Sequence, residues 1–107
     1  MSAPLDSLAD LTISAGGTTS DVGGTNGSTA LAITAPSALT GVVTVEVEQT
    51  STGNTWGTLQ SGGVDVTIAA SKTLTIFPTT FARFRLTSSA AEAANRSFKC
   101  ARLGMTR

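Results

Sequence analysis

Apolar and polar residues alternate along much of this chain with a period of two, which is typical of β-strands whose two faces have different surroundings. The clearest example is the segment 40–50, in which one face carries Val43, Val45 and Val47. Glu46 and Glu48 lie on the opposite face of the same segment. The same alternation predicts further strands over residues 10–17, 29–36, 55–60, 64–68, 73–77, 81–88 and 97–103.

Turn signals such as Asn26-Gly27 and Gly62-Gly63 separate these segments. About eight short strands at this spacing predict an all-β fold, a two-sheet β-sandwich that resembles a jelly roll. Residues 88–96 alone have a helix-like composition, and so short a segment predicts a loop or one helical turn. The predicted core comprises Val43, Val45, Val47, Trp56, Val66, Ile68, Leu74, Ile76, Phe84, Leu86 and Phe98. Val64 is expected to point inward together with Val66 and Ile68.

The 107 residues suit one domain. We expect a polar N-terminal arm over residues 1–9 and a single sandwich over residues 10–107. No apolar run approaches the roughly 20 residues that span a bilayer, and the N-terminus lacks the pattern of a secretion signal. We therefore expect no membrane partner, and a location in the cytoplasm of the producing cell or in a particle assembled there.

The composition excludes several kinds of chemistry. The chain has no His and only one Cys, so neither a Ser-His-Asp triad nor a His or Cys metal cluster can form. Cys100 lies in an alternating segment and is expected to be a buried, unreactive thiol. Glu46 and Glu48 could suggest paired acid and base carboxylates, but strand alternation explains their spacing and predicts a solvated or salt-bridged outer face. We expect no enzyme activity and no cofactor.

The charges are divided unevenly along the chain. Residues 1–71 contain six acidic and no basic residues, whereas residues 72–107 contain seven basic residues and one acidic residue, Glu92. Nucleic acid is not an expected partner, because the basic residues alternate with apolar ones and no aromatic residues are interleaved for base stacking. Salt bridges within the sandwich or between subunits are expected instead.

Trp56 has two interpretations. The segment "QTSTGNTWGTL" resembles an S-x-D-G-x-T-W-x-x-L hairpin seen in many β-sandwich proteins, including galactose-binding-like sugar modules, with Thr52 in place of the Asp. In one interpretation Trp56 anchors the core or an interface. In the other its ring is a stacking platform for a sugar, although the chain has no Tyr and no second Trp to complete such a site.

Four motifs occur in order within residues 31–103: G-x-V-T-V-E-V, T-W-x-x-L, G-x-D-V-T-I and F-x-x-F-R-L-x-S. In this order they resemble small β-sandwich virion proteins of tailed bacteriophages, namely capsid decoration (cement) proteins and neck or tail accessory proteins. The resemblance implies a non-enzymatic decoration protein, located in a virion assembled in the host cytoplasm. It implies binding to the major capsid protein or other virion proteins, and self-association as a homotrimer.

Such a protein would act through contacts between chains. The N-terminal arm could add a strand to a neighbour, and basic side chains could form charge-assisted contacts. The expected contact residues are Leu5, Leu8, Leu11, Arg83, Arg85, Arg96 and Arg102. The alternatives are a neck or tail accessory protein and a carbohydrate-binding jelly-roll module for host recognition.

Overall fold

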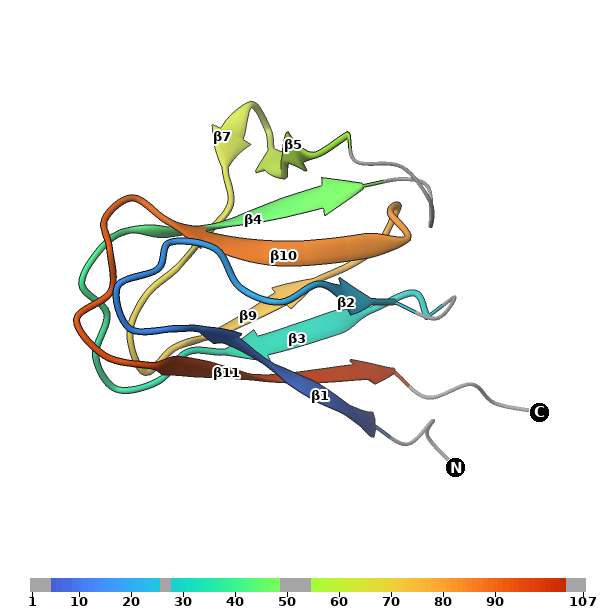
Figure 1. Cartoon of the computed structure of the whole chain (residues 1–107). Coiled ribbons are helices and arrows are strands. Elements are labelled where there is room, and N and C mark those ends of the chain that lie inside the picture. Colours follow the sequence, from blue (N-terminus) through green and yellow to red (C-terminus); the bar gives the residue numbers. More distant parts are fainter. Residues whose placement is uncertain (1–4, 26–27, 49–54, 104–107) are drawn as a thin grey trace.

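The computed structural model describes residues 5–25, 28–48 and 55–103. These residues form two antiparallel sheets that face each other as a sandwich (Figure 1). The first sheet has the order β1 (Leu5–Ile13), β11 (Arg96–Leu103), β3 (Leu31–Thr34) and β9 (Thr73–Ile76). The predicted all-β, two-sheet architecture is confirmed.

The second sheet has the order β2 (Gly23–Gly24), β10 (Arg83–Ser88), β4 (Val43–Glu48) and β5 (Gly57–Thr58), and β8 (Thr67–Ile68) also pairs with β4. β6 (Gln60–Ser61) and β7 (Val64–Asp65) form a separate two-stranded hairpin, and the residues beside it, Leu59 and Val66, are hydrogen-bonded to Val45 in β4. From β1 to β4, and again from β9 to β11, successive strands alternate between the two sheets, which is compatible with a jelly-roll-like arrangement. No helix that could cross a membrane is found in the described part of the chain.

The expected N-terminal arm is not separate from the sandwich. β1 begins at Leu5 and pairs with β11 from Leu5 opposite Leu103 to Leu8 opposite Cys100. The boundary predicted after residue 9 is therefore wrong, and only residues 1–4 of the expected arm lie outside the described residues.

A bulge in β1 explains why this strand was not predicted in full. The register shifts between Leu8 and Leu11, and yet both leucines pack on the core. Strict alternation would place residues three apart on opposite faces, so one extra residue must be absorbed between them. The alternation with a period of two therefore includes Leu11 and Ile13 but ends at the bulge.

The core is formed by apolar side chains from both sheets. Its fully buried members include Ile13, Leu31, Ile33, Val43, Val45, Phe84, Leu86 and Phe98. Burying each such side chain stabilises the fold by roughly 1.5–3 kcal/mol. Most of the predicted core is confirmed, with Val47, Val66 and Leu74 partly buried against it. The expectation that Val64 points inward is wrong, because this side chain is 68% exposed in the β6–β7 hairpin, which projects past β4 (Figure 1).

The segment 89–95 is a loop, which is one of the two outcomes expected for this part of the chain.

Cys100 is a buried free thiol, as expected. Burial raises the pKa of this thiol to about 11, so the neutral and weakly nucleophilic form prevails.

β2 was not predicted, because two glycines carry no side chains that could show alternation. A Cβ on Gly23 would lie 2.9 Å from Phe84 Cζ, so only glycine lets β2 approach β10 this closely.

Candidate interaction surface

The outer face of the second sheet carries two cross-strand ion pairs. The β4–β10 register places Arg83 opposite Glu48 and Arg85 opposite Glu46. Arg83 Nε donates to Glu48 Oε1 over 2.9 Å, and Arg85 Nε donates to Glu46 Oε1 over 2.7 Å. Opposite charges directly across a strand pair stabilise a sheet. The predicted salt-bridged outer face is confirmed.

Trp56 lies over these ion pairs. The guanidinium carbon of Arg85 is 4.3 Å from the centroid of the indole ring, and that of Arg83 is 5.4 Å away. Both distances allow cation–π attraction, worth about 0.5–1 kcal/mol at an exposed site. The residue after Trp56, Gly57, pairs with Val47 and fixes the indole above the sheet. We call Trp56, Glu46, Glu48, Arg83 and Arg85 the Trp56 cluster.

The structure corrects the prediction that Trp56 anchors the core. Its side chain is half-buried, and it does not belong to the hydrophobic cluster formed by the described residues. Alternation could not reveal this, because the strands beside Trp56 are only two residues long and their faces cannot be counted from sequence. The interface and sugar-platform interpretations of Trp56 both remain open.

The two ion pairs differ in their exposure. The side chains of Arg85 and Glu46 are 28% and 23% exposed, so solvent screens this pair. Glu48 is 2% exposed, and its Oε2 atom has no hydrogen-bond partner among the described residues. The positive charge of Arg83 therefore neutralises the Glu48 carboxylate, which water barely reaches. Removal of Arg83 would leave the charge of Glu48 buried without an ion-pair partner.

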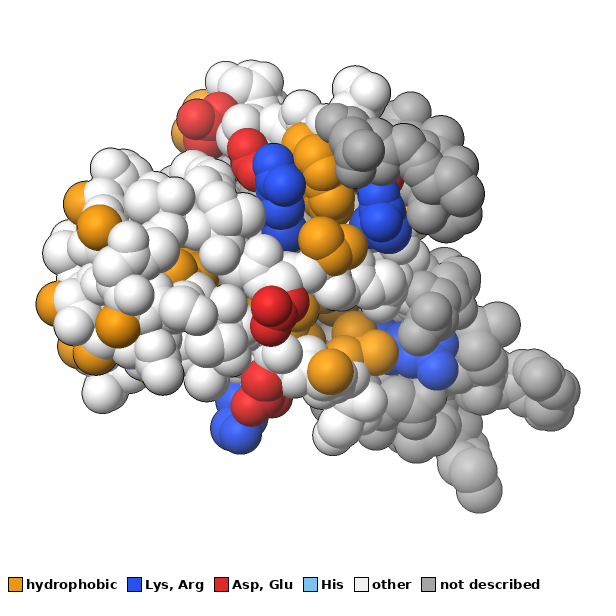
Figure 2. Space-filling view, in the orientation of Figure 1, with side chains coloured by type: hydrophobic (Ala, Val, Ile, Leu, Met, Phe, Trp, Pro, Cys, Tyr) orange, Lys and Arg blue, Asp and Glu red, His pale blue; other side chains and the backbone are white. Residues whose placement is uncertain are grey.

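The Trp56 cluster is suited to protein recognition. Trp and Arg are enriched among the residues that dominate binding energy at protein interfaces. Here the ring and both guanidinium groups are already held in place by one another, so little side-chain entropy remains to be lost on binding. In Figure 2 a hydrophobic surface in the upper half of the molecule lies between basic side chains, with an acidic side chain beside them.

The remaining predicted contact residues do not join this cluster. Leu11 is 2% exposed in its own core and cannot make the expected contact with another chain. Leu8 is partly buried against the same core, and the backbone of Leu5 pairs with β11. Arg102 is half-buried on β11, opposite Leu31 in β3 and Asp6 in β1.

Arg96 is engaged at another place in the molecule. Its Nε donates to Glu92 Oε1 over 2.9 Å, and its Nη2 donates to Thr40 Oγ1 over 3.3 Å. The side chain is only 16% exposed. A buried carboxylate of the same chain thus holds the guanidinium of Arg96, and the expected role of Arg96 in contacts between chains stays a prediction.

Glu92 is the central residue of a network that sequence analysis missed. Its Oε1 also accepts a hydrogen bond from the Thr40 amide over 2.8 Å. Its Oε2 accepts from the Gly41 amide over 3.0 Å and from Ser88 Oγ over 2.6 Å. The backbone of Glu92 bonds in both directions with Gly16 and Gly17.

The Glu92 network joins three loops, residues 14–18, 37–42 and 89–95, at one end of the sandwich. Burial raises the pKa of Glu92, but the bonds from Ser88, Thr40 and Gly41 and the Arg96 ion pair lower it by more, to about 2. A carboxylate so fully supplied with donors is a structural element. The sequence signal that could have identified Glu92 is its position as the single acidic residue within the basic segment 72–107.

Among the residues that the structure describes, no three His, Cys, Asp or Glu side chains gather in a way that could hold a metal ion. Comparison of the chain with protein-family models, with curated proteins and with solved structures finds no match. The function of the chain must therefore be inferred from its own residues.

Proposed function

We propose that this chain is a non-enzymatic structural protein of a tailed-phage virion, and that it acts as a capsid decoration protein. The observation that carries the proposal is the Trp56 cluster, a pre-ordered Trp and Arg surface on the outer face of the second sheet. Such a surface fits the contact role that the resemblance to small virion proteins implies.

The proposed mechanism is binding without turnover. Trp56 would be the apolar anchor of the contact, and the partly exposed Arg85 and Glu46 would bond to polar groups around it. The two arginines and two glutamates sum to zero net charge, so shape and hydrogen bonding would select the partner rather than long-range attraction. The partner is the major capsid protein or a neighbouring copy within a homotrimer.

The test is quantitative peptide mass spectrometry of tailed-phage particles from the strain that encodes the chain, purified on a density gradient. The chain should co-sediment with the major capsid protein in a fixed ratio near one copy per capsid subunit or per few subunits. A ratio typical of a single ring would indicate a neck or tail component instead. Absence from the particles would overturn a virion role.

A second measurement assigns the contact. Particles that lack the chain are mixed with purified native protein, with W56A, or with the matched control F77A. Phe77 is 71% exposed and lies outside the Trp56 cluster. Loss of binding for W56A alone supports the assignment, whereas equal binding of all three proteins contradicts it.

One observation favours a carbohydrate-binding module as a second candidate. The half-buried indole of Trp56 has polar side chains, Arg85 and Glu46, beside it, and aromatic rings flanked by polar groups also suit sugar recognition. Trp56 is the only tryptophan, so titration with common glycans can be followed directly through its fluorescence. A concentration-dependent shift would support this candidate, and a silent titration across a broad glycan set would eliminate it.

A further inference from the structure

The two arginines of the Trp56 cluster use their guanidinium groups differently. Arg83 donates to Glu48 Oε1 through both Nε and Nη2. Arg85 donates to Glu46 Oε1 through Nε, and its Nη1 and Nη2 groups form no hydrogen bond with any residue that the structure describes. The N–H donors of both amino groups of Arg85 are therefore unused within this part of the chain.

Both amino groups of Arg85 reach the surface. Among the described residues, Glu48 Oε2 is an example of a side-chain atom that is buried without a hydrogen-bond partner, and neither Nη1 nor Nη2 of Arg85 is such an atom. The Arg85 side chain as a whole is 28% exposed. A group from outside the chain can therefore contact the end of this guanidinium. We call the Nη1 and Nη2 groups of Arg85 the Arg85 fork.

The Arg85 fork is held in place by two contacts on other parts of the guanidinium. The bond from Nε to Glu46 restrains one edge over 2.7 Å, and the Trp56 ring lies against the group with its centroid 4.3 Å from the guanidinium carbon. Most surface ion pairs contribute little, partly because long side chains lose entropy when they pair. Here much of that loss precedes binding, so a partner meets a pre-ordered donor pair.

We propose that the Arg85 fork binds a carboxylate of the partner protein, with an apolar residue of the partner beside it on the Trp56 ring. The planar end of a guanidinium matches the two oxygens of a carboxylate in a bidentate arrangement. The half-buried indole offers apolar surface directly beside the fork. The assignment rests on the contact role proposed for the Trp56 cluster and adds the chemistry of the partner, an aspartate or glutamate next to an apolar residue.

The glutamates of the Trp56 cluster favour a single carboxylate over a nucleic acid. Glu48 and Glu46 offset the charges of Arg83 and Arg85, so the cluster has no net positive charge. Binding of a phosphate backbone depends on several cations that neutralise successive phosphates. One acidic side chain needs only two parallel hydrogen bonds, which the Arg85 fork can donate.

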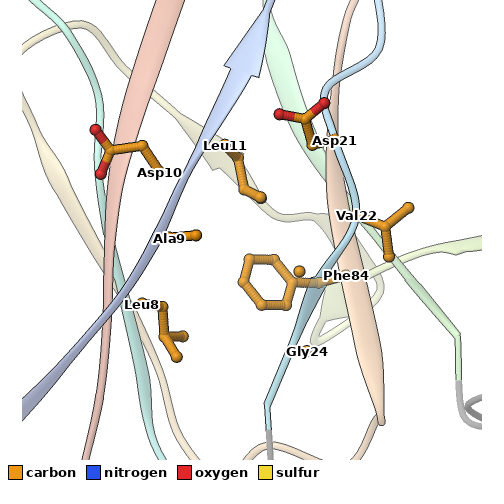
Figure 3. A pocket seen from close by; sticks show the side chains of 9 residues that line it. Leu8, Ala9, Asp10, Leu11, Asp21, Val22, Gly24 and Phe84 are labelled. Carbon is orange, nitrogen blue, oxygen red and sulfur yellow. The ribbon is translucent and has the colours of Figure 1, made fainter.

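A hollow between β1 and β2 lacks such a group (Figure 3). Its floor is formed by Leu11 and Phe84, which are 2% and 0% exposed and belong to the core. Asp10 lies on the other side of β1 in this view and is already paired with Lys99. The contact is therefore assigned to the Arg85 fork and not to this hollow.

The probes are two blocked tripeptides, leucine-glutamate-leucine and leucine-glutamine-leucine, which differ only in the carboxylate. Each is titrated into the full-length protein at constant ionic strength, and binding is followed through the fluorescence of Trp56, the only tryptophan. The glutamate peptide should bind about ten-fold more tightly than the glutamine peptide, because only a carboxylate forms the charge-assisted pair of bonds. The single-stranded oligonucleotide octathymidylate is titrated in the same way.

Three variants localise the contact. R85M removes the fork and should abolish the preference for the glutamate peptide. R85K keeps the charge without the planar pair of donors, and should weaken binding of the glutamate peptide by about three-fold. K99M is the matched control, because it also removes one positive charge but lies on β11 in the other sheet, where the Lys99 side chain is 80% exposed. Thermal melts check that every variant is folded.

A preference for glutamate that R85M abolishes and K99M preserves supports the assignment. Equal affinity for the two peptides, or no saturable change with either, overturns it. A loss of preference in K99M as large as in R85M also overturns it, since binding would then reflect the overall charge of the protein. Tighter binding of octathymidylate than of the glutamate peptide would indicate a phosphate site and overturn it as well. None of these results depends on the presence of the chain in virions, so a failure here is distinct from a failure of the proposed function.

Discussion

The Arg85 guanidinium carbon lies 4.3 Å from the centroid of the Trp56 ring, while Arg85 Nε bonds to Glu46 over 2.7 Å. One side chain thus couples a surface aromatic ring to a cross-strand ion pair. Because this coupling lies on the outer face of the sheet, Trp56 can contribute to recognition without being essential to the core.

We expect W56A to be a mild change in stability. It removes cation–π contacts and partial burial, so the free energy of unfolding should fall by about 1–2 kcal/mol. F98A, at a fully buried core position, should cost about 3–5 kcal/mol. Urea unfolding followed by circular dichroism measures both. If W56A is as damaging as F98A, Trp56 is part of the structural core after all.

The two arginines of the Trp56 cluster should differ in their effect on stability. R83M leaves the carboxylate of Glu48 buried without its ion-pair partner, which should cost about 3 kcal/mol. R85M breaks a pair that solvent already screens and should cost no more than about 1 kcal/mol. The same unfolding assay compares the variants. Equal losses would show that the exposures of Glu48 and Glu46 do not control the energetics.

The Glu92 network predicts an acid-sensitive contribution to stability. The folded-state pKa of Glu92 is lowered from 4.5 to about 2, so the folded state favours the ionised form. The contribution is therefore fully present above pH 4.5 and is lost as the pH falls toward 2. A lowering of this size corresponds to about 3 kcal/mol at neutral pH.

E92Q tests this contribution, with E46Q as the control at a partly exposed position. The difference in unfolding free energy between native protein and E92Q should be large at pH 7 and should shrink between pH 4.5 and pH 2.5. E46Q should show a smaller difference at neutral pH. A pH-independent effect of E92Q would mean that packing in the three loops, rather than the carboxylate charge, is what the substitution disturbs.

Two glycine substitutions test the close approach of β2 to β10. G23A places a Cβ 2.9 Å from Phe84 Cζ and should destabilise the protein by about 1–3 kcal/mol through overpacking. G57A should change stability by less than about 0.5 kcal/mol, because a Cβ there meets nothing within 4 Å. Thermal unfolding compares them. Equal melting temperatures would contradict the tight contact between Gly23 and Phe84.

Alternation in the sequence determined the strands with clear two-sided surroundings. β10 follows it throughout and β4 follows it up to Glu46, so the sequence alone predicted that Val43, Val45, Phe84 and Leu86 are buried and that Glu46, Arg83 and Arg85 lie outside. At the end of β4 the pattern breaks, because Val47 is only partly buried and Glu48 is buried. Composition also limited the available chemistry, because a chain with no His and a single Cys cannot supply the side chains that many catalytic and metal sites require.

Only the tertiary structure decided how distant segments combine. Glu48 and Arg83 are 35 residues apart, and sequence contains no information on register that would pair them. Trp56 and Val64 lie in or beside two-residue strands, where alternation is too short to define a face. Glu92 appears in sequence as one acid in a loop, yet donors from distant loops make it a buried anchor. Periodicity reports local surroundings, whereas these contacts depend on the long-range packing of strands.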